Sequence, residues 1–246
     1  MRPDAKKKIA TVTPKKGPNP VVIGAAVAAV LIVGVVVAIL IGTSGKTNTP
    51  SAGSADPVGI VANDGGGILA NAATAKSNAP TVDLYEDFQC PTCGALEKAM
   101  GPTFASMAKT GEIKLIVHTL SFLDDNLKND SSKRSANAVA CASDAGKFLE
   151  YHAAVFAAQP AQEGAGYTDA QLTAFASEVG ITGAALTTWQ KCTTSGQHNQ
   201  YVADTQTNAE KAGVSSTPTV KLDGKDITRT LTTVEALVAQ VKAATK

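Results

Sequence analysis

The pattern of hydrophobic and polar positions becomes regular from about residue 79. Residues 81–88, TVDLYEDF, alternate with the period of two that predicts a β-strand, and residues 112–123, EIKLIVHTLSFL, predict a second strand. Between them, residues 90–109 are typical of a helix, and Gly111 suits its end because glycine readily adopts the left-handed conformation there. A strand, a helix and a strand therefore open the folded region.

A long helical region is predicted after the second strand. Apolar residues recur at spacings of three and four along residues 141–156, which indicates one buried helix face. Residues 168–180 open with a helix-start pattern and end in glycine, and residues 183–213 predict further helix closed by another glycine. We expect these helices to form an insert over about residues 126–213.

The last part of the chain returns to a strand pattern. Residues 217–229, TPTVKLDGKDITR, predict a hairpin whose turn is Asp223-Gly224, and residues 232–246 predict an amphipathic helix. The order of elements is strand, helix, strand, helical insert, strand, strand, helix. This order predicts an α/β fold in which a small sheet carries a helical insert.

The N-terminal part of the chain contains an uninterrupted apolar stretch. Residues 21–42 are 22 consecutive uncharged and mostly apolar residues. A helix rises ~1.5 Å per residue, so this length would cross a hydrocarbon layer of ~30 Å. A cleavable signal peptide is the alternative, but its apolar region runs only about 7 to 15 residues, and no clear A-x-A site follows at once. We therefore expect a single transmembrane helix.

Charge sets the expected orientation of that helix. Residues 1–20 hold six of the 22 basic residues and one of the 21 acidic residues, and short flanks rich in Lys and Arg stay in the cytoplasm. We expect a single-pass protein of the cell membrane, with a cytoplasmic basic tail and the rest of the chain outside. Without the tail the chain carries 16 basic and 20 acidic residues, so nothing in its charge indicates nucleic-acid binding.

Residues 43–78 differ in composition from the rest of the chain. They are rich in Gly, Ser, Ala, Thr and Asn and have few large apolar residues, which predicts an extracytoplasmic linker ahead of a domain spanning residues 79–243. Within the linker, GIVA (59–62) and GILA (67–70) could pair as a small hairpin, because the Asn, Asp and Gly residues between them tolerate positive φ.

Two of the four cysteines form a C-x-x-C motif, Cys90-Pro91-Thr92-Cys93, at the start of the first predicted helix. The free N–H groups and the dipole of a helix N-terminus stabilise a thiolate, and proline suits the first turn because its missing N–H would lack a partner there. We expect this geometry to expose the sulfur of Cys90 and to turn Cys93 inward, so that Cys90 is the reactive thiol. A lowered pKa of Cys90 would make the pair more oxidising.

Two other interpretations of the motif have less support. A structural zinc ion needs four ligands, but the chain has no second C-x-x-C and no H-x₃₋₅-H, and its three histidines are scattered. A structural disulfide across so short a loop would remove little entropy from the unfolded chain. We therefore predict redox chemistry, with no metal site and no bound cofactor.

The other two cysteines, Cys141 and Cys192, each lie in a helical region. In a segment outside the membrane they should be oxidised, and a bridge between them would pin the two ends of the insert with ~4 kcal/mol of stabilisation. The alternative is a relay pair that passes electrons to Cys93, but neither cysteine has the helix-tip setting that lowers a thiol pKa. We expect a structural disulfide.

Four segments, YEDFQCPTC, GKFLEYHAAVF, LTAFASEVGI and AGVSSTPTVKLDG, resemble the DsbA-like thiol:disulfide oxidoreductases of the thioredoxin superfamily, in the same order. The likeness covers roughly residues 80–243. It implies a thioredoxin fold with a helical domain inserted after the second of these strands, in a membrane-anchored member of the family. It also implies that Cys90 is the nucleophile and that Cys93 is the resolving cysteine.

The resemblance implies roles for four further residues. Pro218 would be the cis-proline that faces the redox pair, and Thr217 before it would contact the backbone of the substrate. The spacer residues Pro91 and Thr92 would tune the potential. At the position of Thr92, this chain lacks the histidine that the best-known oxidants of the family carry.

The chain departs from the family pattern at the buried acid. Six residues before the first cysteine, where many members carry an acid, this chain has Leu84. Glu86 shares the strand parity of Leu84, so its carboxylate could transfer protons for Cys93, or it could be a solvated acid at the strand end. His152 lies on an apolar helix face and is expected to be a packed helix residue.

The residues and the resemblance together indicate an extracytoplasmic thiol:disulfide oxidoreductase that introduces disulfides into exported cysteine-containing proteins. The resemblance implies reoxidation by a quinone-linked membrane partner of the DsbB or vitamin-K-epoxide-reductase type. A disulfide reductase or isomerase that uses the same residues is one alternative, because potential and partners set the direction of exchange. A tethered chaperone or assembly factor without catalysis is the other.

Overall fold

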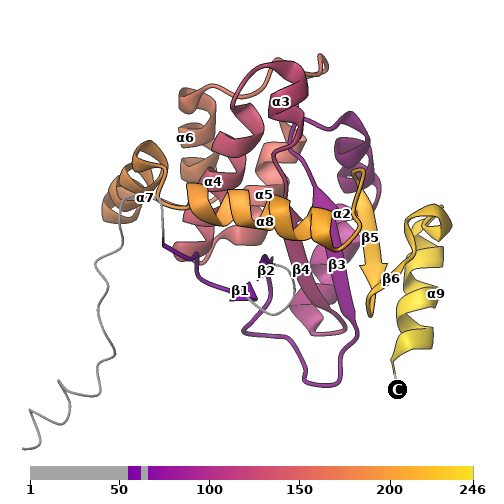
Figure 1. Cartoon of the computed structure of the whole chain (residues 1–246). Coiled ribbons are helices and arrows are strands. Elements are labelled where there is room, and N and C mark those ends of the chain that lie inside the picture. Colours follow the sequence, from indigo (N-terminus) through magenta and orange to yellow (C-terminus); the bar gives the residue numbers. More distant parts are fainter. Residues whose placement is uncertain (1–54, 62–65, 246) are drawn as a thin grey trace, which may run out of the picture. The chain divides into compact units, whose positions relative to one another are not determined.

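The computed structural model describes residues 55–61 and 66–245. Within them lies a six-stranded sheet in the order β1-β2-β4-β3-β5-β6 (Figure 1). β3 and β4 pair in parallel, and every other neighbouring pair in the sheet is antiparallel. The strands are β1 (Ile60–Val61), β2 (Gly67–Leu69), β3 (Thr81–Glu86), β4 (Lys114–Thr119), β5 (Thr219–Leu222) and β6 (Lys225–Asp226).

Helices α3 to α8 lie between β4 and β5 along the chain, and this order confirms the predicted α/β fold with a helical insert. A 3-10 turn at Thr228–Thr230 precedes the C-terminal helix. The helices are α2 (Pro91–Thr110), α3 (Leu123–Leu127), α4 (Ser131–Asp144), α5 (Phe148–Ala157), α6 (Asp169–Glu178), α7 (Gly183–Ser195), α8 (Asn199–Lys211) and α9 (Val234–Ala244).

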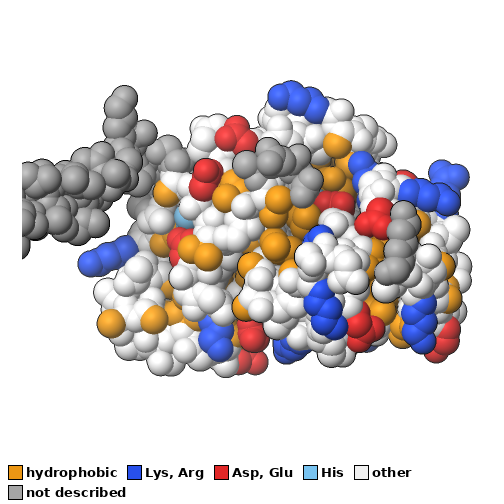
Figure 2. Space-filling view, turned by 90° about the horizontal axis from the view of Figure 1, so that it is seen from below, with side chains coloured by type: hydrophobic (Ala, Val, Ile, Leu, Met, Phe, Trp, Pro, Cys, Tyr) orange, Lys and Arg blue, Asp and Glu red, His pale blue; other side chains and the backbone are white. Residues whose placement is uncertain are grey.

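Helices cover both faces of the sheet. α8 packs against β4 and crosses in front of the strands in Figure 1, whereas α2, which packs against α5 and α9, lies behind them. On β3, Leu84 shares the main core with Phe104 of α2, and the next residue, Tyr85, packs with Ala209 of α8. Successive strand residues therefore bury opposite faces. On the surface seen in Figure 2, basic and acidic side chains are interspersed.

The sheet starts earlier in the chain than predicted. Ile60 of β1 lies opposite Ile68 of β2, which in turn lies opposite Val117 of β4. Gly67 is required in β2, because a Cβ there would lie 2.4 Å from a side-chain carbon of β4. The hairpin expected from GIVA and GILA is confirmed. Residues 60–61 and 67–69, within the stretch whose composition predicts mostly linker, thus belong to the sheet.

Two glycines divide helical stretches that the pattern predicts to be continuous. Gly146 has φ 67° between α4 and α5, and Gly196 has φ 62° between α7 and α8. Left-handed backbone of this kind ends a helix, so each stretch becomes two helices. The second strand is also shorter than residues 112–123, because the chain leaves the sheet after Thr119 to enter α3.

The predicted transmembrane helix (21–42), its basic flank (1–20) and the first part of the linker lie outside the described residues. No helix in the described part of the chain is long and apolar enough to cross a membrane. The anchor and its orientation therefore stay predictions.

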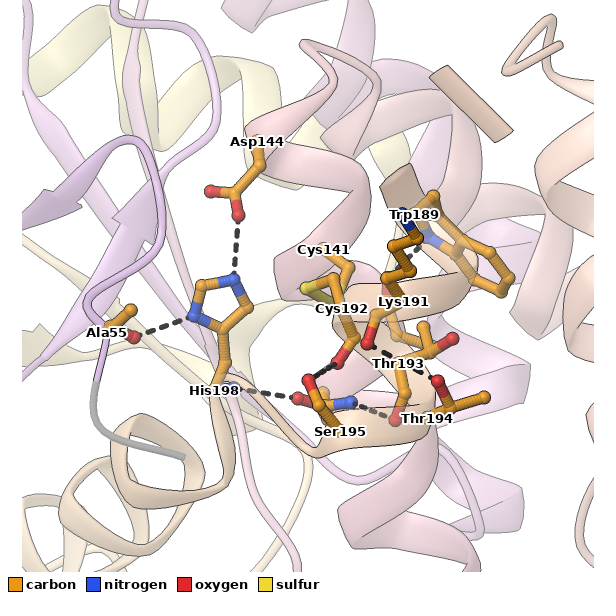
Figure 3. The surroundings of a disulfide bond; sticks show 12 residues. Ala55, Cys141, Asp144, Trp189, Lys191, Cys192, Thr193, Thr194, Ser195 and His198 are labelled. Carbon is orange, nitrogen blue, oxygen red and sulfur yellow. Dashed lines mark hydrogen bonds and ion pairs between the residues drawn. A yellow bond between two sulfur atoms is a disulfide. The ribbon is translucent and has the colours of Figure 1, made fainter. Parts of the chain in front are cut away.

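A disulfide joins α4 to α7 in the helical insert (Figure 3). The Sγ atoms of Cys141 and Cys192 are bonded, and their Cα atoms lie 6.0 Å apart. Both residues are buried. The indole N–H of Trp189 on α7 also donates to the Ala138 carbonyl on α4, at 3.1 Å. The bridge thus lies within a packed helix pair, as a structural disulfide does.

Next to the disulfide, His198 fastens the first described residues to the insert (Figure 3). Its Nδ1 lies 2.7 Å from the Ala55 carbonyl, and its Nε2 lies 2.8 Å from the Asp144 carboxylate. Both partners can accept, so the site favours a ring that carries a proton on each nitrogen. Burial lowers the pKa of His198, but the hydrogen bonds to Asp144 and then to Ala55 outweigh burial and raise it above its ordinary value.

Candidate active site

The C-x-x-C cysteines lie where β3 is followed by α2. Cys90 is the N-cap of α2, with φ −76° and ψ 115°, and Pro91 occupies the first turn. The backbone N–H groups of Cys93 and Gly94 donate to the Cys90 carbonyl at 3.1 and 3.2 Å. The motif is therefore wound into the first turn, which places Cys90 at the positive end of the helix dipole.

The two thiols have different surroundings. Both are free, but Cys93 is completely buried whereas Cys90 keeps 7% of its surface exposed. Cys90 is less exposed than predicted because the loop of Thr217 and Pro218, joined by a cis peptide bond, lies against it. The Cys90 thiol donates to the Thr217 carbonyl at 3.5 Å. The structure thus brings the loop of Thr217 and Pro218 against the C-x-x-C motif, as the resemblance implies.

The Thr92 hydroxyl contacts both the Cys90 sulfur and the Thr217 carbonyl. Its Oγ1 lies 3.0 Å from the Cys90 sulfur and 3.3 Å from the Thr217 carbonyl oxygen. A thiolate has no proton to give, so once Cys90 ionises, the Thr92 hydroxyl donates to the sulfur. The Thr217 carbonyl then no longer receives a hydrogen bond from Cys90.

These contacts move the pKa values of the two cysteines apart. A hydrogen bond from the Cys93 thiol lowers the pKa of Cys90 to about 5, against the effect of burial and with further lowering from Thr217 and Thr92. Burial raises the pKa of Cys93 far above its ordinary value, and the hydrogen bond to Cys90 and the charge of Glu86 raise it further. At neutral pH Cys90 is a thiolate and Cys93 is a thiol.

Glu86 is buried behind the motif. Its side chain is 1% exposed, and its Oε2 lies 3.0 Å from Nε2 of His152 on α5. The other nitrogen of that ring, Nδ1, faces Oε2 of Glu97 on α2 at 3.8 Å. Burial raises the pKa of Glu86 well above its ordinary value, and the charge of Cys90 adds to this effect. The alternative of a solvated strand-end acid is therefore wrong, and His152 is a partner of Glu86 as well as a packed residue.

A polar network that the sequence pattern does not reveal ties the loop before Cys90 to the helical insert. Asp87 is completely buried and accepts hydrogen bonds from the Gln89 N–H at 2.9 Å and the Ser132 hydroxyl at 2.5 Å. It also accepts from the Leu123 N–H at 3.2 Å. Burial raises the pKa of Asp87 to about 7, although these hydrogen bonds lower it. The acidic pair before the motif is thus wholly internal.

Gln159, just after α5, holds the same loop from another side. Its amide donates to the carbonyls of Phe88 and Cys90 at 2.9 and 3.0 Å. It also lies over Gly94, where a Cβ would come 2.0 Å from its Oε1. The partners of Gln159 are backbone atoms from a distant part of the chain, so no local spacing in the sequence could have identified it.

Two clusters of described residues bring possible metal donors within 4.8 Å of one another, namely Cys141, Cys192 and His198, and Glu86, Glu97 and His152. The sulfurs of the first cluster are bonded to each other. In the second, the two carboxylates approach different nitrogens of one imidazole.

Comparisons with known proteins place this geometry in a family. A sequence model of the thioredoxin family matches residues 72–243. The structure is similar to the reduced disulfide bond oxidoreductase DsbG of Mycobacterium tuberculosis, with 29% identity, a TM-score of 0.58, and coverage of 70% of this chain and 85% of that one. No significant match was found among curated protein sequences.

Two further solved structures extend the likeness. Oxidised DsbA of M. tuberculosis shows 29% identity and a TM-score of 0.58 over 70% of this chain and 91% of that one. MdbA of Corynebacterium diphtheriae, a thiol-disulfide oxidoreductase, shares the fold at 23% identity, with a TM-score of 0.62 over 80% of this chain and 100% of that one. The chain therefore belongs to the thioredoxin family and is a DsbA-like thiol-disulfide oxidoreductase.

Proposed function

We propose that this oxidoreductase works outside the cytoplasm as an oxidase, which donates the Cys90–Cys93 disulfide to exported proteins. A substrate thiolate attacks the Cys90 sulfur, the Cys90–Cys93 bond breaks, and Cys93 leaves as a thiolate that takes up a proton. A second substrate thiolate then attacks the substrate sulfur of the mixed disulfide, and Cys90 leaves as a thiolate. The substrate loses two electrons and the enzyme gains them.

The pKa of Cys90, lowered to about 5, is the observation that carries the oxidase direction. A thiolate that is stable at neutral pH is a good leaving group, and it stabilises the dithiol form relative to the disulfide. Each unit by which the pKa falls favours the thiolate by ~1.4 kcal/mol. A disulfide whose reduced form is stabilised in this way is a strong oxidant.

The proposal that the catalytic domain lies outside the cytoplasm rests on the N-terminal sequence. An apolar span at residues 21–42 behind a basic flank would leave the catalytic domain on the extracytoplasmic side. Oxidants persist in such compartments, and thiols of newly exported proteins are available there. A quinone-linked membrane protein of the DsbB or vitamin-K-epoxide-reductase type would then reoxidise the cysteines.

The reduction potential of the Cys90–Cys93 couple tests the direction. We would equilibrate the full-length protein with glutathione buffers, trap free thiols, and assign the state of each cysteine by mass. A value near ~−120 mV supports the oxidase, and one near ~−270 mV favours a reductase. The variant Cys90→Ser is the control, because it leaves Cys141 and Cys192 as the only pair able to contribute a couple.

A further inference from the structure

Disulfide exchange at this site poses a problem of proton delivery. Cys93 leaves as a thiolate when the disulfide is donated, and it must lose a proton when the disulfide re-forms. Its side chain has no solvent contact, at 0% exposure, and burial disfavours its charged form. A proton must therefore reach a sulfur that water does not touch.

We propose that Glu97 and His152 link the buried carboxyl group of Glu86 to solvent, so that these three side chains together carry the proton that Cys93 gains and loses in each turnover. The inference rests on the proposed thiol-disulfide exchange and concerns either direction of it. Glu97 and His152 act through Glu86 and do not touch the reacting sulfur atoms.

The three side chains form a proton relay, with the imidazole of His152 between the two carboxyl groups. Oε2 of Glu86 lies 3.0 Å from Nε2 of His152, and Oε2 of Glu97 lies 3.8 Å from Nδ1. The other oxygen of Glu86, Oε1, is buried and has no hydrogen-bond partner among the described residues. The charge of Glu86 also raises the pKa of Cys93. Closing the longer gap to a hydrogen bond needs a side-chain movement of only ~1 Å.

The outer end of this proton relay, at Glu97, reaches an open cleft. Between α2 and α5 lies a cleft of ≈ 690 Å³, lined by Glu97, His152 and Gln159 among mostly apolar side chains. The Glu97 side chain is 9% exposed, compared with 1% for Glu86. Water in the cleft can therefore exchange protons with Glu97, which the deeper carboxyl group cannot do directly.

A glycine in the middle of α2 makes room for this arrangement. A Cβ at Gly101 would lie 2.4 Å from Oε2 of Glu97, one helical turn earlier. Glycine inside a helix costs about 1 kcal/mol relative to alanine. Here its lack of a side chain lets the Glu97 carboxyl group lie close to the helix, on the side of His152.

The net movement of one proton along the relay is balanced at every atom. When Cys93 leaves as a thiolate, Glu86 gives it a proton and receives one from Nε2–H of His152. Glu97 gives its proton to Nδ1 and recovers one from water, so the ring changes tautomer without becoming charged. Re-formation of the disulfide sends the proton outward along the same path and restores the first tautomer.

Burial favours the neutral forms of Glu97 and His152 in the relay. Burial raises the pKa of Glu97 to about 7, with a further increase from Glu86 and a decrease from His152. Burial lowers the pKa of His152, against the charge of Glu97. The remaining titratable groups at the chain are Cys90 and Cys93 at its inner end and Lys98 at the cleft. Glu97 is thus poised to take up and release a proton near neutral pH.

The variant Glu97→Gln tests the relay, because glutamine keeps the shape of the side chain and cannot pass a proton. The oxidised full-length protein is mixed with dithiothreitol, and the loss of the Cys90–Cys93 disulfide is followed by acid quench and mass. We expect the rate constant, corrected for dithiothreitol ionisation, to fall about tenfold to a hundredfold. The inflection near pH 7 should disappear, and the solvent isotope effect should change.

The control is Glu150→Gln, which makes the same exchange on the exposed surface of α5 and should leave the rate constant unchanged. The variant Glu97→Ala gives a second test, since acetate is small enough for the cleft and should restore its rate constant in proportion to acetate concentration. A stabilising role alone would not give such a rescue.

The outcomes separate this inference from the proposed function. If dithiothreitol reduces both Glu97 variants at the wild-type rate, with the wild-type pH profile and no effect of acetate, the relay is wrong while the redox function stands. If the wild-type protein has no reversible Cys90–Cys93 couple, the proposed function fails and the relay with it.

Discussion

The redox end of the molecule (Glu86, Cys90, Cys93, Glu97 and His152) and the disulfide end (Cys141, Asp144, Cys192 and His198) each bury a histidine beside a carboxylate. At the redox end His152 lies 3.0 Å from Glu86. At the disulfide end His198 lies 2.8 Å from Asp144. Although the two contacts are similar, the pKa of His152 is lowered and that of His198 is raised.

The difference comes from what else each ring contacts. Burial lowers the pKa of His152 and raises that of its partner Glu86, so burial favours the neutral form of each. His198 has an acceptor at each nitrogen, and its proton is held in place. A buried histidine therefore serves proton transfer where its partners are nearly neutral, and serves structure where they are fixed acceptors.

Replacement of cysteine by serine should give the largest contrast in activity between the two ends. Cys90→Ser should reduce the oxidation of a dithiol peptide to the uncatalysed rate, because no other described thiol is at a helix N-terminus with an accessible sulfur. The double variant Cys141→Ser, Cys192→Ser should keep its activity at temperatures where it is folded. Activity of Cys90→Ser above the uncatalysed rate would show that the other pair exchanges too.

Stability should give the opposite contrast. The double variant Cys141→Ser, Cys192→Ser should lose ~4 kcal/mol of unfolding free energy, because removal of the bridge frees a long loop in the unfolded chain. Cys90→Ser should change the unfolding free energy much less. Urea unfolding of both variants, followed by circular dichroism, checks this. Equal losses in the two would mean that the helical disulfide has no special structural role.

At the redox end, the sequence predicts the C-x-x-C motif better than it predicts the residues that contact it. The C-x-x-C motif is local, so its place at the start of α2 follows from adjacent residues. The contact of Cys90 with Thr217 spans 127 residues and was accessible only through resemblance to a family. The alternation pattern placed Glu86 on the side of Leu84, but it could not say that His152 of a distant helix would bury it.

The fold was predictable where one segment carries its own signal. The Asp223-Gly224 turn, with φ of 47° and 79°, is visible in two letters of sequence. The strands β1 and β2 were read mainly as linker because two or three residues each, among glycines, give too short a pattern. Their place in the sheet is decided by pairing with β4, which composition does not record.

A smaller effect should sharpen the account of the thiolate. Thr92→Val removes the hydroxyl that lies 3.0 Å from the Cys90 sulfur, so we expect the pKa of Cys90 to rise by about one unit, equivalent to ~1.4 kcal/mol. Thiolate absorbance near 240 nm as a function of pH measures it. Thr92→Ser keeps a hydroxyl and is the matched control. A pKa that is the same in both variants would leave Cys93 and the helix end as the main causes.

An effect of similar size concerns the charge of His198, and its pH dependence distinguishes His198 from His152. Because the folded pKa of His198 is raised, its contribution to stability is complete below the unfolded pKa of about 6.5 and is lost as pH rises through the folded value. The stability difference between wild type and His198→Gln, about 1 to 2 kcal/mol at pH 6, should therefore shrink toward pH 9.

His152→Gln is the counterpart, and it should respond to pH in the opposite sense. The folded pKa of His152 is lowered, so the wild-type ring destabilises the fold as pH falls below about 6.5, where the unfolded ring binds a proton and the folded one does not. The stability advantage of wild type over His152→Gln should thus shrink toward acid. Urea unfolding of both variants from pH 5 to pH 9 measures the two slopes, and slopes of the same sign would mean that the two buried histidines carry the same charge after all.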